Sequence, residues 1–271
     1  MRKLFLPFVM ALLCNVVSFA QFAGGNGTEG NPYLISTKAQ FEAIAQQSNG
    51  ASGKYFKQTA DINLGVYENR TSSIIPTFSG TYDGDGYSIT YQASFNGTTN
   101  DGNYALFGLV EVGTLENINV NADVTISGTA NDMQVALLCG KFTPNKQTET
   151  SSGSKPVNYS YTYSYGGIII NCNVNGNINS TVSASEGGGT DAGLLVGESQ
   201  GQIKYCNGNG NVRGLGYVGG LIGQMSRGQY RERHQEERWP WSGSSWKDVY
   251  SDYMYYESSV SVIGSSFIGT V

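Results

Sequence analysis

Short apolar bursts separated by glycine and asparagine run through most of this 271-residue chain. One recurring half-motif is two apolar residues followed by glycine: Leu106-Phe107-Gly108, Leu138-Cys139-Gly140, Leu195-Val196-Gly197 and Leu221-Ile222-Gly223. The other is a strand of alternating apolar and polar residues, with copies that begin at Leu115, Ile170, Ile203 and Ile263. The step from Gly197 to Gly223 falls within the roughly 20 to 50 residues that are typical of solenoid repeats.

We expect these strands to form a mainly β domain in which successive turns of a coil stack on one another. A strand of about five residues cannot bury its apolar face alone. Stacked turns bury a continuous core, and each turn satisfies the backbone of the next. Glycine permits sharp bends, and asparagine at recurring positions can form ladders. An antiparallel sandwich with glycine-rich loops is the alternative that the pattern leaves open.

A helical pattern occurs near the N-terminus, over residues 37–48. Thr37 and Gln40 have the spacing of a capping box. Phe41, Ile44 and Ala45 fall on one helical face, and Gly50 and Gly53 end the pattern. We therefore expect one short helix that caps the coil.

Two groups of motifs occur in a characteristic order. The N-terminal group is Gly30-Asn-Pro-Tyr-Leu-Ile-Ser-Thr37, then Gly53-Lys-Tyr-Phe56, then Phe78-Ser-Gly-Thr-Tyr-Asp-Gly-Asp-Gly86. The later motif is Tyr217-Val-Gly-Gly-Leu-Ile-Gly223, with weaker copies at Gly193–Gly197 and Ala105–Gly108. This order resembles that of bacterial secreted proteins with GLUG repeats.

The resemblance implies a right-handed parallel β-helix from an adhesin-like surface protein of the kind common in Bacteroidota and Firmicutes. It carries over no catalytic residue. It implies a single β-solenoid domain over 21–271, with an N-terminal module (24–104) and GLUG-like repeats (105–271). Two long insertions, 143–166 and 226–260, interrupt the repeats and have no counterpart in the family. Because Val271 lies inside a repeat, we expect a natural short form or a fragment of a longer protein.

The first twenty residues have the pattern of a secretory signal peptide. Arg2 and Lys3 precede an apolar run from Leu4 to Val17, and small residues flank Phe19 before a cleavage site after Ala20. The run is too short for a comfortable transmembrane helix. Cys14 follows Leu13 instead of the small residue that a lipoprotein signal requires. We therefore expect export to the cell surface or the extracellular space.

Charge and composition exclude further classes of protein. The net charge is −5, so a basic nucleic-acid-binding surface is not expected. Aromatic residues make up 12% of the chain, which argues against disorder. Of the three cysteines after the signal peptide, Cys172 and Cys206 have equivalent sequence contexts. We interpret them, with Cys139, as small apolar core residues, and a Cys172–Cys206 disulfide is the alternative.

The two insertions concentrate the aromatic residues. The first contains Tyr159, Tyr161, Tyr163 and Tyr165, which would share one face of a strand. The second contains Trp239, Trp241, Trp246, Tyr253 and Tyr255. Exposed tyrosine and tryptophan often mark recognition surfaces. These nine residues are the predicted binding surface, although the aromatics could instead cover one another in two hairpins that pack together.

Residues with catalytic or metal-binding potential are sparse. His234 is the only histidine and lies in a charged segment that we interpret as solvated. Asp83 and Asp85 resemble part of a calcium loop, but the remaining ligands and the closing glutamate are missing. We expect no cofactor and no metal. A polysaccharide-degrading enzyme, the alternative, would need Asp83, Asp85, Asp101 and Asp191 to converge in one cleft.

The sequence therefore predicts a non-catalytic, exported β-solenoid that presents aromatic loops to a host or dietary glycan or to a surface protein. A passive scaffold within a larger surface protein is the third possibility. The sequence gives no indication of the oligomeric state.

Overall fold

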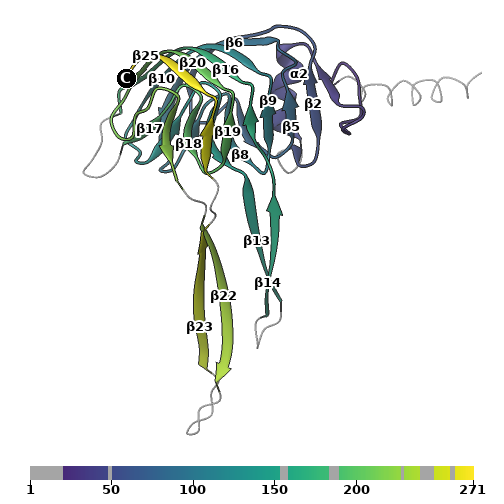
Figure 1. Ribbon diagram of the computed structural model, residues 1–271, viewed down its shortest axis with the longest axis vertical. Helices are drawn as coiled ribbons and strands as arrows, with labels where there is room; N and C mark the ends of the chain where they lie inside the picture. Colours follow the sequence, from purple (N-terminus) through teal and green to yellow (C-terminus); the bar gives the residue numbers. More distant parts are fainter. Residues whose placement is uncertain are drawn as a thin grey trace, which may run out of the picture.

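The computed structural model describes residues 21–47, 51–152, 158–182, 189–226, 229–238, 247–256 and 260–271. Within these residues the chain is mainly β, as the sequence predicts (Figure 1). No helix in this part of the chain is long and apolar enough to cross a membrane. The predicted signal peptide, 1–20, lies outside the described residues.

Four parallel sheets make up the body of the molecule. Sheet 1 contains, in spatial order, β1 (Tyr33–Ile35), β2 (Tyr55–Gln58), β5 (Thr81–Asp83), β9 (Thr114–Glu116), β15 (Ile169–Ile170), β19 (Gln202–Lys204) and β24 (Ser261–Ile263). Sheet 2 contains β3 (Ile62–Arg70), β6 (Ser88–Gly97), β10 (Asn119–Gly128), β16 (Asn173–Ser180), β20 (Asn207–Arg213) and β25 (Ser266–Thr270). Sheet 3 contains β7 (Asn103–Tyr104), β11 (Met133–Val135) and β17 (Thr190–Ala192). Sheet 4 contains β4 (Ile75–Phe78), β8 (Phe107–Glu111), β12 (Cys139–Thr143), β18 (Val196–Ser199) and β21 (Ile222–Met225).

From β5 to β20 the chain visits the four sheets in a fixed order and then returns to sheet 1, one strand further along, whereas the earlier β3 passes directly to β4 without a strand in sheet 3. β9, β10, β11 and β12 form one circuit, and β15, β16, β17 and β18 form the next. We call each circuit a rung. Every residue from Asn119 to Ile126 pairs with its counterpart between Asn173 and Ser180. Equivalent residues of successive rungs therefore stand in columns, with neighbours about 4.8 Å apart.

The apolar–apolar–glycine motifs occupy one place in successive rungs. Leu106, Leu138 and Leu195 are buried in the core, and Leu221, on the last such rung, is half-buried. The motif glycines stack in sheet 4, where strand backbones approach closely. A Cβ atom on Gly197 would lie 2.7 Å from the carbonyl oxygen of Gly140 and 2.7 Å from the nitrogen of Val135. The glycine recurs because no side chain fits at this position.

Asparagine ladders run across the outer face of sheet 2, as the sequence predicts. The Asn173 amide donates to Asn119 Oδ1 (2.9 Å), and the Asn207 amide donates to Asn173 Oδ1 (3.0 Å). Four residues further along the strands, the Asn177 side-chain amide donates to Asp123 Oδ1 and the Asn211 side-chain amide donates to Asn177 Oδ1, each across 2.8 Å. Each side-chain amide thus forms a hydrogen bond with the side chain on the neighbouring rung, and these ladders help to fix the register of the strands.

The three cysteines that the structure describes are free and buried. Their predicted role as small core residues is confirmed, and the alternative disulfide is not formed. Cys172 and Cys206 stand on neighbouring rungs, because the residues that follow them, Asn173 and Asn207, pair in register. The Cys172 amide donates to Cys206 Sγ at 3.4 Å. Burial first, and the neighbouring Cys206 second, raise the pKa of the Cys172 thiol.

The predicted helix is shorter than its pattern. It comprises α2 (Lys38–Ala43) and a 3₁₀ turn, η1 (Ile44–Gln46). The Thr37 hydroxyl accepts a hydrogen bond from the backbone amide of Gln40. In return, the Gln40 side-chain oxygen accepts from the backbone amide of Ser36, which lies one residue earlier than the donor in a standard capping box. Phe41 and Ile44 are buried, but Ala45 is exposed, contrary to the prediction. With 3.6 residues per turn, Ala45 would lie on the buried face with Phe41 and Ile44. The tighter 3₁₀ turn rotates Ala45 away from that face.

Gly197→Ala tests the close approach of neighbouring rungs. The added methyl group would overlap backbone atoms that cannot move independently, so we expect a loss of about 1–3 kcal/mol of unfolding free energy. Gly30→Ala is the matched control, because nothing lies within 4 Å of the new Cβ atom. Urea denaturation followed by circular dichroism measures both. Equal stability of the two variants would contradict the close packing of the rungs at this position.

Candidate functional site

Both insertions leave the body at the same corner, where sheet 4 passes to sheet 1. The first, an antiparallel hairpin of β13 (Asn145–Ser152) and β14 (Asn158–Tyr165), follows β12. The second, of β22 (Gln229–Arg238) and β23 (Lys247–Tyr256), follows β21. Figure 1 shows both hairpins projecting from one side of the body. Among the described strands, antiparallel pairing is confined to these hairpins, so the sandwich alternative does not describe the body.

The hairpins stand two rungs apart. In the intervening rung, β18 reaches β19 through a tight turn at Gln200 and Gly201. Two rungs span about 10 Å, which is also the usual distance between sheets that pack face to face. Cα atoms of β14 come within 8 Å of Cα atoms of β22. The two hairpins therefore form a pair whose spacing is set by the body.

The first hairpin carries its tyrosines on one face. Its register pairs Tyr161 with Glu149, Tyr163 with Gln147 and Tyr165 with Asn145. The rings of Tyr163 and Tyr165 stack, with centroids 6.1 Å apart and an interplanar angle of 14°. Tyr165 is 65% exposed, whereas Tyr161 and Tyr163 are half-buried. The result is a flat aromatic stripe that is open to solvent at the Tyr165 end.

The other predicted surface residues are placed only in part. Tyr159 pairs with Ser151 in the same hairpin. Tyr253 and Tyr255 lie on β23, where they pair with Glu232 and Tyr230. The tryptophans lie outside the described residues: Trp239, Trp241 and Trp246. The structure therefore describes the side chains of three tyrosines of the first hairpin. It places the strands of the second hairpin beside the strands of the first.

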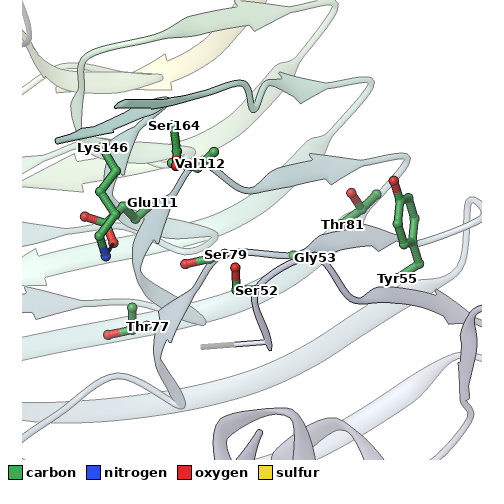
Figure 2. Close-up of a pocket in the computed structure, with 11 residues that line it drawn as sticks. Ser52, Gly53, Tyr55, Thr77, Ser79, Thr81, Glu111, Val112, Lys146 and Ser164 are labelled. Carbon is green, nitrogen blue, oxygen red and sulfur yellow. Dashed lines mark hydrogen bonds and ion pairs between the residues drawn. The ribbon is translucent and has the colours of Figure 1, made fainter. Parts of the chain in front are cut away.

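Sequence reasoning missed a cavity at the foot of the first hairpin. Its volume is about 640 Å³, and it lies between the hairpin and the first rungs of the body (Figure 2). Its lining comes from short segments far apart in the chain: Ser52, Gly53, Tyr55, Thr77, Ser79, Gly80, Thr81, Glu111, Val112, Lys146 and Ser164. Each segment alone reads as an ordinary turn or strand, so no local pattern indicates the cavity.

A second polar cluster lies where sheets 3 and 4 meet. Asn103, Gln134 and Asp191 form one column of sheet 3. On sheet 4, Lys141 and Glu198 pair in register and form an ion pair. Gln134, Asp191 and Glu198 are all more than nine-tenths buried. The motif glycines create the room for this cluster, because Gly197 lies directly against the backbone of Asp191.

The two buried carboxyl groups are held in different protonation ranges. Burial, and secondarily the charge of Glu198, raise the pKa of Asp191 to about 6, although the neighbouring Gln134 side chain acts to lower it. Burial alone would also raise the pKa of Glu198. Hydrogen bonds from Lys141 and Ser226 outweigh that effect and hold the pKa of Glu198 below its usual value.

The four aspartates that an enzyme would need to bring together occupy three separate places. Asp83, on sheet 1, and Asp85, in the following turn, lie together and both pair with Lys57. Asp101 precedes β7, while Asp191 lies on β17, two rungs further along sheet 3. Asp191 and Glu198 differ in pKa as acid–base pairs do, but their burial leaves a bound sugar no access to either carboxyl group.

Asp191→Asn tests the cost of the buried carboxyl group. Because its folded-state pKa is raised, ionisation of Asp191 removes stability from the wild-type protein as the pH rises from about 4 to above 6. Asparagine cannot ionise, so the variant should be more stable by about 1–2 kcal/mol at pH 7.5 and equally stable near pH 4. Thermal denaturation across this pH range measures the difference.

Asp61→Asn is a control in which the substitution should change stability in the opposite direction. Hydrogen bonds from the Ser88 amide and hydroxyl hold the pKa of Asp61 below its usual value. That variant should be less stable than wild type at pH 7.5, with the difference shrinking as the pH falls through the pKa. A pH-independent effect of Asp191→Asn would contradict the assigned protonation.

No family model matches the chain. A protein of Evansella cellulosilytica, whose name describes it as a Gly-rich membrane protein, is 34% identical over 117 residues, which cover 40% of this chain and 13% of that protein. A crystal structure from Bacteroides ovatus, named as an immunoglobulin A1 protease, has 18% identity and a TM-score of 0.38 over 76% of this chain and 65% of that one. A superposition this loose carries no argument about fold or function.

Proposed function

We propose that this chain is an exported, non-catalytic binding protein, adhesin-like in function, that presents its paired hairpins to a glycan or to a surface protein. The observation that carries the proposal is the common origin of the hairpins: both leave the same corner, two rungs apart, and the first carries an aromatic stripe that ends in exposed Tyr165. A passive scaffold would not require the insertions to share a corner.

The proposed architecture is a right-handed parallel β-helix of the GLUG-repeat type. The parallel pairing in four sheets and the stacked motif glycines support it. The hand follows from a general rule, because parallel strands joined by a crossover are right-handed in almost all proteins. Successive rungs supply many such crossovers.

The physical argument for binding is one of rigidity. A stack of paired strands holds the two hairpin bases at a fixed distance, so little order has to be gained when a partner binds. Tyrosine adds large contact area at a low entropic cost, because its side chain has few rotatable bonds. The stacked rings of Tyr163 and Tyr165 are already fixed by each other, and the Gln147 amide donates to the Tyr163 hydroxyl at 3.2 Å. The stripe is therefore preorganised in the free protein.

Replacing Tyr161, Tyr163 and Tyr165 together by serine tests the proposal. We expect at least a tenfold loss of binding to the glycans or surface proteins that the wild type recognises on an array, because flat apolar contact area is removed. Serine keeps a polar β-strand residue at each position, and circular dichroism verifies the fold.

The control replaces Tyr87 and Tyr217, two exposed tyrosines of the body, by serine. This variant should bind as the wild type does. Loss of binding in the control, or unchanged binding in the hairpin variant, would overturn the assignment of function to the hairpins.

A further inference from the structure

The cavity at the foot of the first hairpin has the size of a small-molecule site. Its volume of about 640 Å³ lies within the range of about 300–1,000 Å³ that such sites occupy. The hairpin contributes Lys146 and Ser164 to one wall, from the strand positions that alternate with the tyrosines. The body contributes the opposite wall. The cavity and the aromatic stripe therefore lie on opposite faces of the same hairpin.

The lining is dominated by hydroxyl groups. Six residues supply them: Ser52, Tyr55, Thr77, Ser79, Thr81 and Ser164. Within the part of the chain that the structure describes, none of these six side-chain hydroxyls has a protein hydrogen-bond partner. Each can therefore donate to, and accept from, a ligand. Figure 2 shows Ser52 and Ser79 in the middle of the site, with Tyr55 and Thr81 side by side at one end.

The charges at the site neutralise each other. Glu111 and Lys146 form an ion pair at the end opposite Tyr55 (Figure 2). An anionic ligand would meet the Glu111 carboxylate in the cavity and a net charge of −5 over the chain. A cationic ligand would compete with Lys146 for its partner. The electrostatics therefore favour an uncharged ligand.

A strained backbone position also lines the cavity. Val112 has a φ of 57°, a left-handed conformation that is costly for a β-branched residue. Such outliers cluster at ligand sites, where the surrounding structure holds them in place. Here the Val112 amide donates to the Thr143 carbonyl at 2.9 Å, so the strained residue is held by the next rung.

We propose that this cavity binds a short, uncharged oligosaccharide. Neutral sugars present many hydroxyl groups and no charge, and the cavity offers many unpartnered hydroxyl groups around one neutralised ion pair. The ring of Tyr55 supplies a flat surface at one end, against which a sugar ring can stack. The inference rests on the proposed function, since it names a ligand class for the same corner of the molecule.

Isothermal titration with neutral and acidic probes tests the site. The probes are maltotetraose, cellotetraose and xylotetraose, with tetragalacturonate as the acidic counterpart. We expect at least one neutral probe to bind and the acidic probe not to bind. The double variant Ser79→Ala, Thr81→Val removes two hydroxyls with little change in shape and should weaken binding about tenfold or more, as expected for two lost hydrogen bonds.

The matched control is Thr125→Val, Ser127→Ala on the exposed face of sheet 2, which should bind like the wild type. Unchanged binding by the cavity variant, equal binding of the acidic probe, or no neutral probe bound at millimolar concentration would overturn the inference. The tyrosine-to-serine variant of the hairpin separates this site from the proposed function. Binding that is lost in that variant but kept in the cavity variant places the sugar on the aromatic stripe. The reverse result places it in the cavity and argues against the stripe.

Discussion

In-register stacking of parallel rungs is the constraint on which the rest of this structure depends. Each residue has a neighbour about 4.8 Å above it and another below it, so a side chain must tolerate near-copies of itself at that distance. Asparagine meets this condition by donating to the next asparagine, as Asn173 and Asn207 do. Leucine meets it by packing in the core. Glycine is required where the backbones of neighbouring rungs touch, as at Gly197.

The same constraint explains where the molecule accepts insertions. At a corner between two sheets, only the first and last residues have to pair with the neighbouring rung. A long hairpin can therefore replace a tight turn there. β18 and β19 are joined by such a turn, while the rungs on either side carry hairpins at the same corner. Since the rungs fix the spacing of the hairpin bases, a regular body becomes a support for two projecting elements and for the cavity beside the first.

The residues that stack in columns can be predicted from the sequence, because the same steric and hydrogen-bonding requirements recur in every rung. The repeated glycine, the buried leucines and the asparagine ladders could all be predicted from that recurrence. The helix pattern misplaced Ala45, because periodicity alone does not indicate where an α-helix tightens into a 3₁₀ turn. The stripe of Tyr161, Tyr163 and Tyr165 follows from strand alternation. The cavity could not be predicted, because its hydroxyl groups come from segments as distant as Ser52 and Ser164, and only the folded corner brings them together.

The distance between Gln92 and Thr270 tests the stacking most directly. These residues share one outer column of sheet 2, in which each strand pairs in register with the next. Four rungs separate them, so their Cα atoms should lie about 19 Å apart. Double electron–electron resonance between spin labels at cysteines placed there, in a background without the buried thiols, should give one narrow distribution near that value. A broad distribution, or a distance beyond about 30 Å, would contradict the stacked arrangement.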